Sequence, residues 1–153
     1  MPTPPEATPA LYDDDFYAWS QRTAQLVREG RWSELDRNHL AEEIGDLGIS
    51  VERDITSQLI CVLNHLLKAT QQPEKHTRSS NLTIAEGRAR ISQIPRRNPS
   101  LESQLDSRLA DAYEVARIRA AGETDLDLVK FPEVCPFSAP EVRGSTTRSQ
   151  PRP

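Results

Sequence analysis

Residues 40–66 read LAEEIGDLGISVERDITSQLICVLNHL, and this stretch decides the fold. Its apolar residues recur at steps of three and four, the spacing of one face of an α-helix: Leu40, Ile44, Leu47, Val51, Ile55, Leu59, Val62 and Leu66. No proline interrupts the stretch, so it predicts one helix roughly 40 Å long at about 1.5 Å per residue. A helix of that length needs packing partners along its whole face, which predicts a helical bundle.

The rest of the chain also predicts helices, and it contains no convincing strand or internal repeat. The long helix is expected to begin near Ser33 or Asp36 and to end near Thr70, before Pro73. Start and stop residues predict three further helices. The first begins at Tyr12, has Asp13–Asp15 in its first turn and ends at Gly30. The second covers 82–94 and is ended by Pro95, and the third runs from the N-cap Asn98 to Gly122.

The segment Phe131–Phe137 contains two prolines, which rule out a helix there. We expect an extended strap that covers an open end of the bundle with Phe131, Val134 and Phe137. The predicted fold is therefore an all-α antiparallel bundle of about four helices with one long central helix and a non-helical C-terminal strap. Residues 1–10 and 139–153 are rich in Pro, Ser and Thr and predict disordered tails around a helical domain over 11–138.

The composition indicates a protein with a hydrophobic core, without a transmembrane helix and without a disulfide framework. The chain has 153 residues, enough for a sizeable core, although its mean hydropathy is -0.64. It has no apolar run long enough for a transmembrane helix and no secretory signal, so we expect a cytoplasmic protein that does not enter a membrane. Its two cysteines, Cys61 and Cys135, are too few for a disulfide framework, and a buried thiol at Cys61 is favoured over a bridge between them.

The net charge of -4 conceals a basic block in the middle of the chain. Residues 61–97 carry two acids and seven bases, the bases being Lys68, Lys75, Arg78, Arg88, Arg90, Arg96 and Arg97. Such a block can bind the phosphates of a nucleic acid, or it can compensate the acidic first sixty residues within the fold. We favour compensation, because the block contains no aromatic residue on which a base could stack.

A metal site is the first chemical hypothesis. His39, Glu42 and Glu43 share one face of the long helix, where their spacing suits a metal-binding helix. The His-x-x-Glu pattern occurs only once, however, so no complete set of ligands is predicted and no metal or other cofactor is expected. The alternative, which we favour, is that Glu43 pairs with an arginine from another helix.

His65 is the second polar residue of interest, because leucines surround it in the sequence. If the helices on either side of residues 75–76 form an antiparallel hairpin, Glu86 faces His65, and we predict a hydrogen bond between them. The candidate polar groups of the core are therefore Glu43, His65, Glu86 and Arg88. A thiolate–imidazole pair of Cys61 with His65 is disfavoured, since burial raises the pKa of a thiol. We identify no catalytic residue, because no Gly-rich phosphate loop, Cys-x-x-Cys or HExxH motif is present.

Several short blocks resemble the DUF29 family in order and over about residues 11–142: YDDDFYAW at 12–19, GRWSELD at 30–36, LAEEI at 40–44, HLLK at 65–68, QPE at 72–74, TIAEGR at 83–88, NPSL at 98–101 and FPEVCPF at 131–137. The resemblance implies a bacterial all-helical domain of unknown function, frequent in cyanobacteria. It implies no activity, cofactor or catalytic residue. One position departs from the family pattern, because Ala69 follows the HLLK block where an aromatic residue is common.

Three functional hypotheses follow. The first is a non-enzymatic interaction or scaffold protein that binds an unidentified protein partner or a second copy of itself. The second is a nucleic-acid-associated bundle that uses the basic block, and the third is a metal-dependent bundle that uses His39, Glu42 and Glu43.

Overall fold

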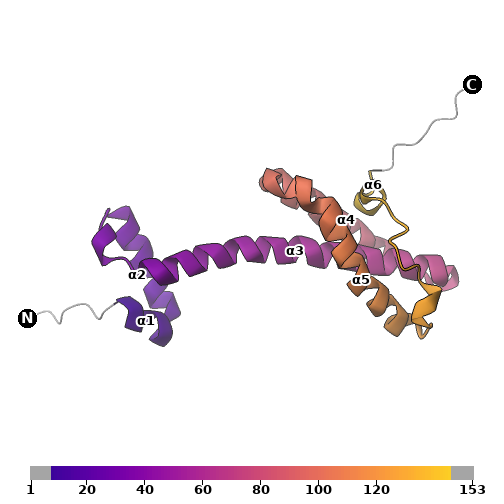
Figure 1. The fold of residues 1–153 in the computed structure, drawn as a ribbon, viewed down its shortest axis with the longest axis horizontal. Coiled ribbons are helices and arrows are strands. Elements are labelled where there is room, and N and C mark those ends of the chain that lie inside the picture. Colours follow the sequence, from indigo (N-terminus) through magenta and orange to yellow (C-terminus); the bar gives the residue numbers. More distant parts are fainter. Residues whose placement is uncertain (1–7, 146–153) are drawn as a thin grey trace, which may run out of the picture. The chain divides into compact units, whose positions relative to one another are not determined.

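The computed structural model describes residues 8–145, which contain helices and connecting segments but no strand (Figure 1). The α-helices are α1 (Thr8–Asp14), α2 (Phe16–Arg28), α3 (Arg37–Gln71), α4 (Arg78–Arg97), α5 (Leu105–Thr124) and α6 (Ala139–Arg143). Short 3-10 segments lie between them: η1 (Trp32–Glu34), η2 (Pro73–Lys75), η3 (Pro99–Gln104) and η4 (Leu128–Lys130). The all-α fold class and the long helix are confirmed.

The described residues form two compact units, called unit 1 (within residues 1–50) and unit 2 (within residues 51–153), and the single helical domain over 11–138 stays a prediction. The boundary falls within α3, so the first part of this helix belongs to unit 1 and the rest to unit 2. The predicted tails are described only in part, because residues 1–7 and 146–153 lie outside the described residues.

The N-terminal region of unit 1 is two helices rather than the predicted single one. The chain leaves the helical conformation at Asp15, which has φ -150° and ψ 86°. The Asp15 carboxylate accepts a hydrogen bond from the Ala18 amide at 2.9 Å and so caps the start of α2. Asp13 and Asp14 therefore lie at the end of α1 and not in a first turn. An aspartate followed by helix-forming residues favours an N-cap over continuation of the preceding helix.

The end of α2 agrees with the sequence. Gly30 has φ +70°, a left-handed conformation that glycine adopts without steric cost. The Gly30 amide donates to the Val27 carbonyl at 3.2 Å, and the Arg31 amide donates to the Leu26 carbonyl at 3.0 Å. This pair of bonds is a Schellman motif, which satisfies the last carbonyl groups of the helix.

The apolar face of α3 is buried only in its second part. Ile55, Leu59 and Val62 are buried, in agreement with the sequence prediction. Ile44 and Leu47 are instead 60% and 69% exposed. The prediction that packing partners cover the whole face is therefore wrong for the part of α3 in unit 1.

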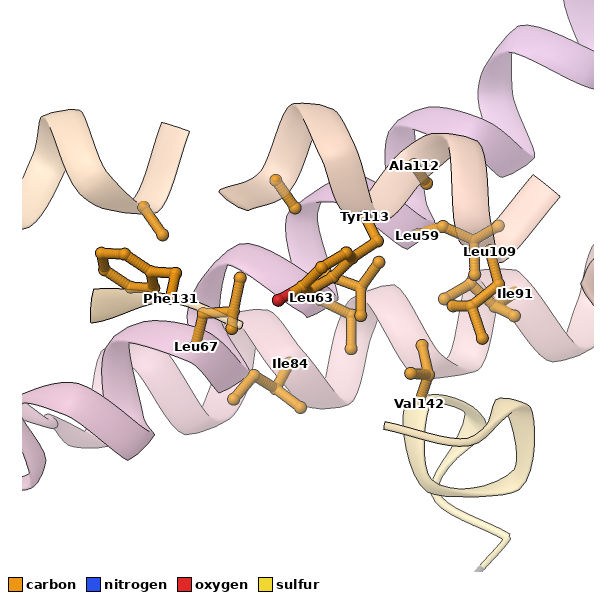
Figure 2. Close-up of a cluster of buried hydrophobic side chains, with 13 residues drawn as sticks. Leu59, Leu63, Leu67, Ile84, Ile91, Leu109, Ala112, Tyr113, Phe131 and Val142 are labelled. Carbon is orange, nitrogen blue, oxygen red and sulfur yellow. The ribbon is translucent and has the colours of Figure 1, made fainter. Parts of the chain in front are cut away.

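The core of unit 2 joins α3, α4 and α5 with two side chains from the C-terminal segment, and Figure 2 shows these side chains pointing toward one another. Its buried members are Leu59, Val62, Leu63, Leu67, Ile84, Ile91, Leu109, Ala112, Tyr113, Ala116, Ala120, Phe131 and Val142. The alanines of α5 are small, which allows its neighbours to pack closely against it.

The boundaries of α4 and α5 differ from the prediction. Pro95 does not end α4, which continues to Arg97 with the proline ring buried. Near a helix end the missing amide of proline removes a single hydrogen bond, and burial of the ring offsets that loss. Asn98 is the N-cap of the next helical segment, η3, as predicted, and it is also the C-cap of α4. Its side chain makes no capping bond with η3 and instead donates to the Ile94 carbonyl at 2.9 Å. Helix α5 continues past Gly122 to Thr124, and its C-cap, Asp125, has a left-handed conformation.

The predicted strap lies along unit 2 as a largely non-helical segment after η4. Phe131 is buried and Phe137 is half-buried, but Val134 is 81% exposed and covers nothing. Side chains of α5 hold the strap through its carbonyl groups. The Tyr113 hydroxyl donates to the Pro132 carbonyl at 2.6 Å, and Nε of Arg117 donates to the Phe131 carbonyl at 3.1 Å.

The expectation of a disordered tail from residue 139 does not hold for 139–145, because α6 lies there. Ser138 and Glu141 form a capping box at its start, and Gly144 ends it with φ +74°. Val142 is buried in the core of unit 2, which explains why a helix this short is retained.

Candidate interaction groove

The polar residues predicted on α3 in unit 1 are organised by an aromatic residue from α1. The Tyr12 ring stacks on the His39 ring with 3.8 Å between centroids, and the Tyr12 hydroxyl donates to Glu43 Oε1 at 2.6 Å. His39 Nδ1 donates to Asp36 Oδ2 at 2.5 Å. The prediction that Glu43 pairs with an arginine is therefore wrong, since a phenol occupies that place.

These contacts do not form a metal site. His39 is bonded to Asp36 and Glu43 to Tyr12, while the Glu42 side chain is exposed. Among residues 8–145, no group of three or more His, Cys, Asp or Glu side chains is arranged to hold a metal ion.

The carboxylates of α3 give this part of unit 1 a negative potential. The hydrogen bond to Glu43, burial and the charges of Glu42 and Asp46 raise the pKa of Tyr12 to about 12. Tyr12 therefore remains a hydrogen-bond donor at neutral pH. The hydrogen bond to Asp36 raises the pKa of His39, and more distant carboxylates add to that effect.

An apolar groove of about 370 Å³ lies between α2 and the beginning of α3. It is lined by Trp19, Ser20, Thr23, Ala24, Val27, Arg28, Leu40, Glu43, Ile44 and Leu47. Trp19 and Thr23 are buried, and their Nε1 and Oγ1 atoms have no hydrogen-bond partner within the described residues. Ile44 and Leu47 are exposed, so this groove is an apolar surface that the described part of unit 1 leaves open.

The predicted hydrogen bond between His65 and Glu86 in unit 2 does not form. Nδ1 of His65 is buried and has no hydrogen-bond partner among residues 8–145, and burial lowers the pKa of His65. Glu86 is exposed and accepts a hydrogen bond from Arg90 at 3.2 Å. His65 and Glu86 lie at similar sequence distances from the turn, but this spacing does not fix the direction of either side chain.

Arg88, the remaining candidate, has a structural role in unit 2. Its Nε donates to the Val142 carbonyl at 3.1 Å, and its Nη2 donates to the Glu141 carbonyl at 2.8 Å. Arg88 therefore joins α4 to α6. The sequence placed it in a basic block and offered no sign of a partner more than fifty residues away.

The basic block is compensated in part, and by neighbours within unit 2. Lys68 Nζ contacts Glu123 at 2.6 Å, Arg90 pairs with Glu86, and Arg88 binds the carbonyls of α6. The other members remain exposed: Lys75, Arg78, Arg96 and Arg97. The seven basic side chains therefore do not form one continuous surface of unpaired charge.

A smaller cavity of about 190 Å³ lies beside His65. Part of its polar lining is bonded internally, because Lys68 contacts Glu123 and Gln72 Nε2 donates to the Thr124 carbonyl at 3.3 Å. Nδ1 of His65 is the buried lining atom that has no partner within residues 8–145.

The two cysteines are free. Burial raises the pKa of each thiol, and Cys135 Sγ donates to the Phe137 carbonyl at 3.3 Å. The bridge left open by the sequence is therefore not formed, and neither thiol has the lowered pKa of a nucleophile.

The fold and the groove define a small all-α protein with an open apolar surface in unit 1. The chain belongs to the DUF29 family, described as a domain of unknown function, whose sequence profile matches residues 11–145. Comparisons with curated proteins and with solved structures found no match. Within residues 8–145, no helix has the length and apolar character needed to cross a membrane.

Proposed function

We propose that this protein is a non-enzymatic interaction protein and that the groove of unit 1 binds a helix of a partner protein. One observation carries the proposal: Ile44 and Leu47, at 60% and 69% exposure, line an apolar groove beside Trp19. Exposed apolar surface gathered in a groove is typical of a binding site, and an amphipathic helix is a common occupant of such grooves.

The gain from covering these side chains is substantial. Full burial of a Leu or Ile side chain contributes about 1.5–3 kcal/mol, and both residues here are more than half exposed. The site therefore offers an occupant apolar area that solvent now covers.

Within residues 8–145, no contact favours the nucleic-acid or metal hypotheses. The basic block includes both bonded and exposed side chains, and His39 and Glu43 are already bonded to Asp36 and Tyr12. The proposal retains the cytoplasmic location expected from the sequence and the bacterial origin that the family resemblance implies.

The test uses a fluorescein-labelled synthetic helix with leucine at i, i+3, i+4 and i+7 and neutral polar residues elsewhere. Fluorescence anisotropy should show binding to the full chain, and the double variant Ile44→Gln/Leu47→Gln should weaken that binding by about tenfold or more. Val129→Gln is the matched control, because Val129 is 77% exposed but lies in unit 2. Equal binding by the double variant and the control would contradict the proposal.

A further inference from the structure

We infer that the partner helix carries lysine or arginine residues along one flank of its apolar face, because carboxylates border the α3 side of the groove. This inference rests on the proposed function and specifies the chemistry of the occupant. It applies to unit 1 alone.

The geometry of α3 sets the position of these charges. Glu43 and Asp46 each precede a groove-lining apolar residue by one position, Ile44 and Leu47 respectively. At 3.6 residues per turn, one position is a rotation of about 100° around the helix axis, and both carboxylates are displaced in the same direction. An acidic edge therefore runs beside the apolar line.

The opposite edge of the apolar line on α3 carries small residues. Gly48 follows Leu47 by one position, and a Cβ atom added at Gly48 would have no described atom within 4 Å. A helix in the groove can thus approach α3 closely on one edge while it presents cationic side chains to the other.

The excess of negative charge in the described part of unit 1 also favours a partner helix with cationic side chains. Residues 8–50 contain nine carboxylates and four arginines. Glu29 and Glu34 are paired with Arg31, and Asp36 is paired with His39. The exposed carboxylates of Glu42 and Asp46 make no hydrogen bond or ion pair within residues 8–145.

The raised pKa of Tyr12 reports on the same carboxylates, because Glu43, Glu42 and Asp46 all disfavour its ionised form. The one cation that lines the groove is Arg28, on α2, and it lies on the opposite wall from the acidic edge. The two walls therefore differ in charge, and the α3 wall attracts a basic flank.

A second copy of this chain fits the groove less well than a basic helix does. It would bring another unit 1 whose described residues also carry an excess of carboxylates. Like charges brought together across an interface oppose association, most strongly at low ionic strength.

The experiment compares two labelled peptides with identical leucine positions, one with lysine and one with glutamate at the flanking positions. At about 0.01 M ionic strength the lysine peptide should bind the full chain about tenfold more tightly, and the ratio should fall at about 0.15 M. The variant Asp46→Asn should lower this preference while it still binds the neutral peptide, because Asp46 is the exposed carboxylate of the acidic edge. The matched control, Asp111→Asn, removes one exposed carboxylate of α5 in unit 2.

Each outcome decides a separate point. If the lysine and glutamate peptides bind equally, the charge inference is overturned while the groove remains a docking site. If none of the peptides binds, the proposed function also fails. If sedimentation shows a dimer of the full chain that Leu47→Gln dissociates, a second copy occupies the groove and the basic partner is rejected. Far-UV circular dichroism checks that each variant is folded.

Discussion

Single residues set the spacing between helices in unit 2, and Gly87 is the clearest case. It is buried on α4, and a Cβ atom added there would lie 2.6 Å from Cγ2 of Val62 on α3. Real Cβ atoms do not approach so closely, so the two helices can pack at their present distance only with glycine here. The low helix propensity of glycine is the accompanying cost, about 1 kcal/mol relative to alanine.

The variant Gly87→Ala should lower the free energy of unfolding of unit 2 by about 1–2 kcal/mol, because overpacking outweighs the gain in helix propensity. Gly122→Ala is the control, since a Cβ atom at Gly122 in α5 would meet no described atom within 4 Å. That change should be neutral or stabilise by up to about 1 kcal/mol. Urea unfolding followed by circular dichroism measures both, and equal effects would show that helix spacing is not limiting.

At the scale of elements, α6 shows how a short helix is retained. Five residues are too few for an isolated helix, so its stability comes from tertiary contacts. Val142 supplies the apolar contact with the core, and Arg88 binds two of the α6 carbonyls. Gly144 lies directly against Arg88, because a Cβ atom there would be 2.9 Å from Cδ of Arg88.

The variant Arg88→Gln should release α6 and lower the free energy of unfolding by about 1–3 kcal/mol, since two hydrogen bonds from a charged donor are lost. Hydrogen exchange of the amides in 139–145 should accelerate. Arg90→Gln provides the comparison, because within residues 8–145 Arg90 pairs with the exposed Glu86, and its loss should cost less than about 1 kcal/mol. Unchanged exchange in the Arg88 variant would show that Val142 alone holds the helix.

At the scale of the whole molecule, the two units differ in how much they bury. Among residues 11–50 of unit 1, the buried side chains are Trp19, Thr23 and Leu26, whereas unit 2 contains an extended core. Because apolar burial is the main favourable contribution to folding, the described part of unit 1 has the smaller source of stability. A partner that binds the groove only when unit 1 is folded would raise the free energy of unfolding of unit 1.

We therefore expect unit 1 to unfold at a lower denaturant concentration than unit 2. Both tryptophans, Trp19 and Trp32, are in unit 1, so tryptophan fluorescence reports on that unit alone. Its transition should precede the main transition seen by far-UV circular dichroism, which reports on helices of both units. Coincident transitions would instead show that the whole chain unfolds as one cooperative unit.

The sequence by itself determined the all-α class, the length of α3 and several of the helix ends. These features depend on local periodicity and on residues such as Gly30, whose conformational preference acts over one or two neighbours. Helix α6 was missed because Ser, Pro and Arg in that segment also suit a disordered tail, and only the burial of Val142 separates the two cases.

The tertiary structure alone decided which part of the apolar face of α3 is covered. Spacing shows that Ile44, Leu47 and Leu59 share a face, but it is identical whether a neighbour packs there or not. The tertiary structure also decided the partners of the polar side chains. A carboxylate accepts a hydrogen bond from an arginine or from a phenol, so the choice of Tyr12 for Glu43 depends on which group the fold brings near. The open groove of unit 1 is thus a property of tertiary packing, while the helices that form it are properties of the sequence.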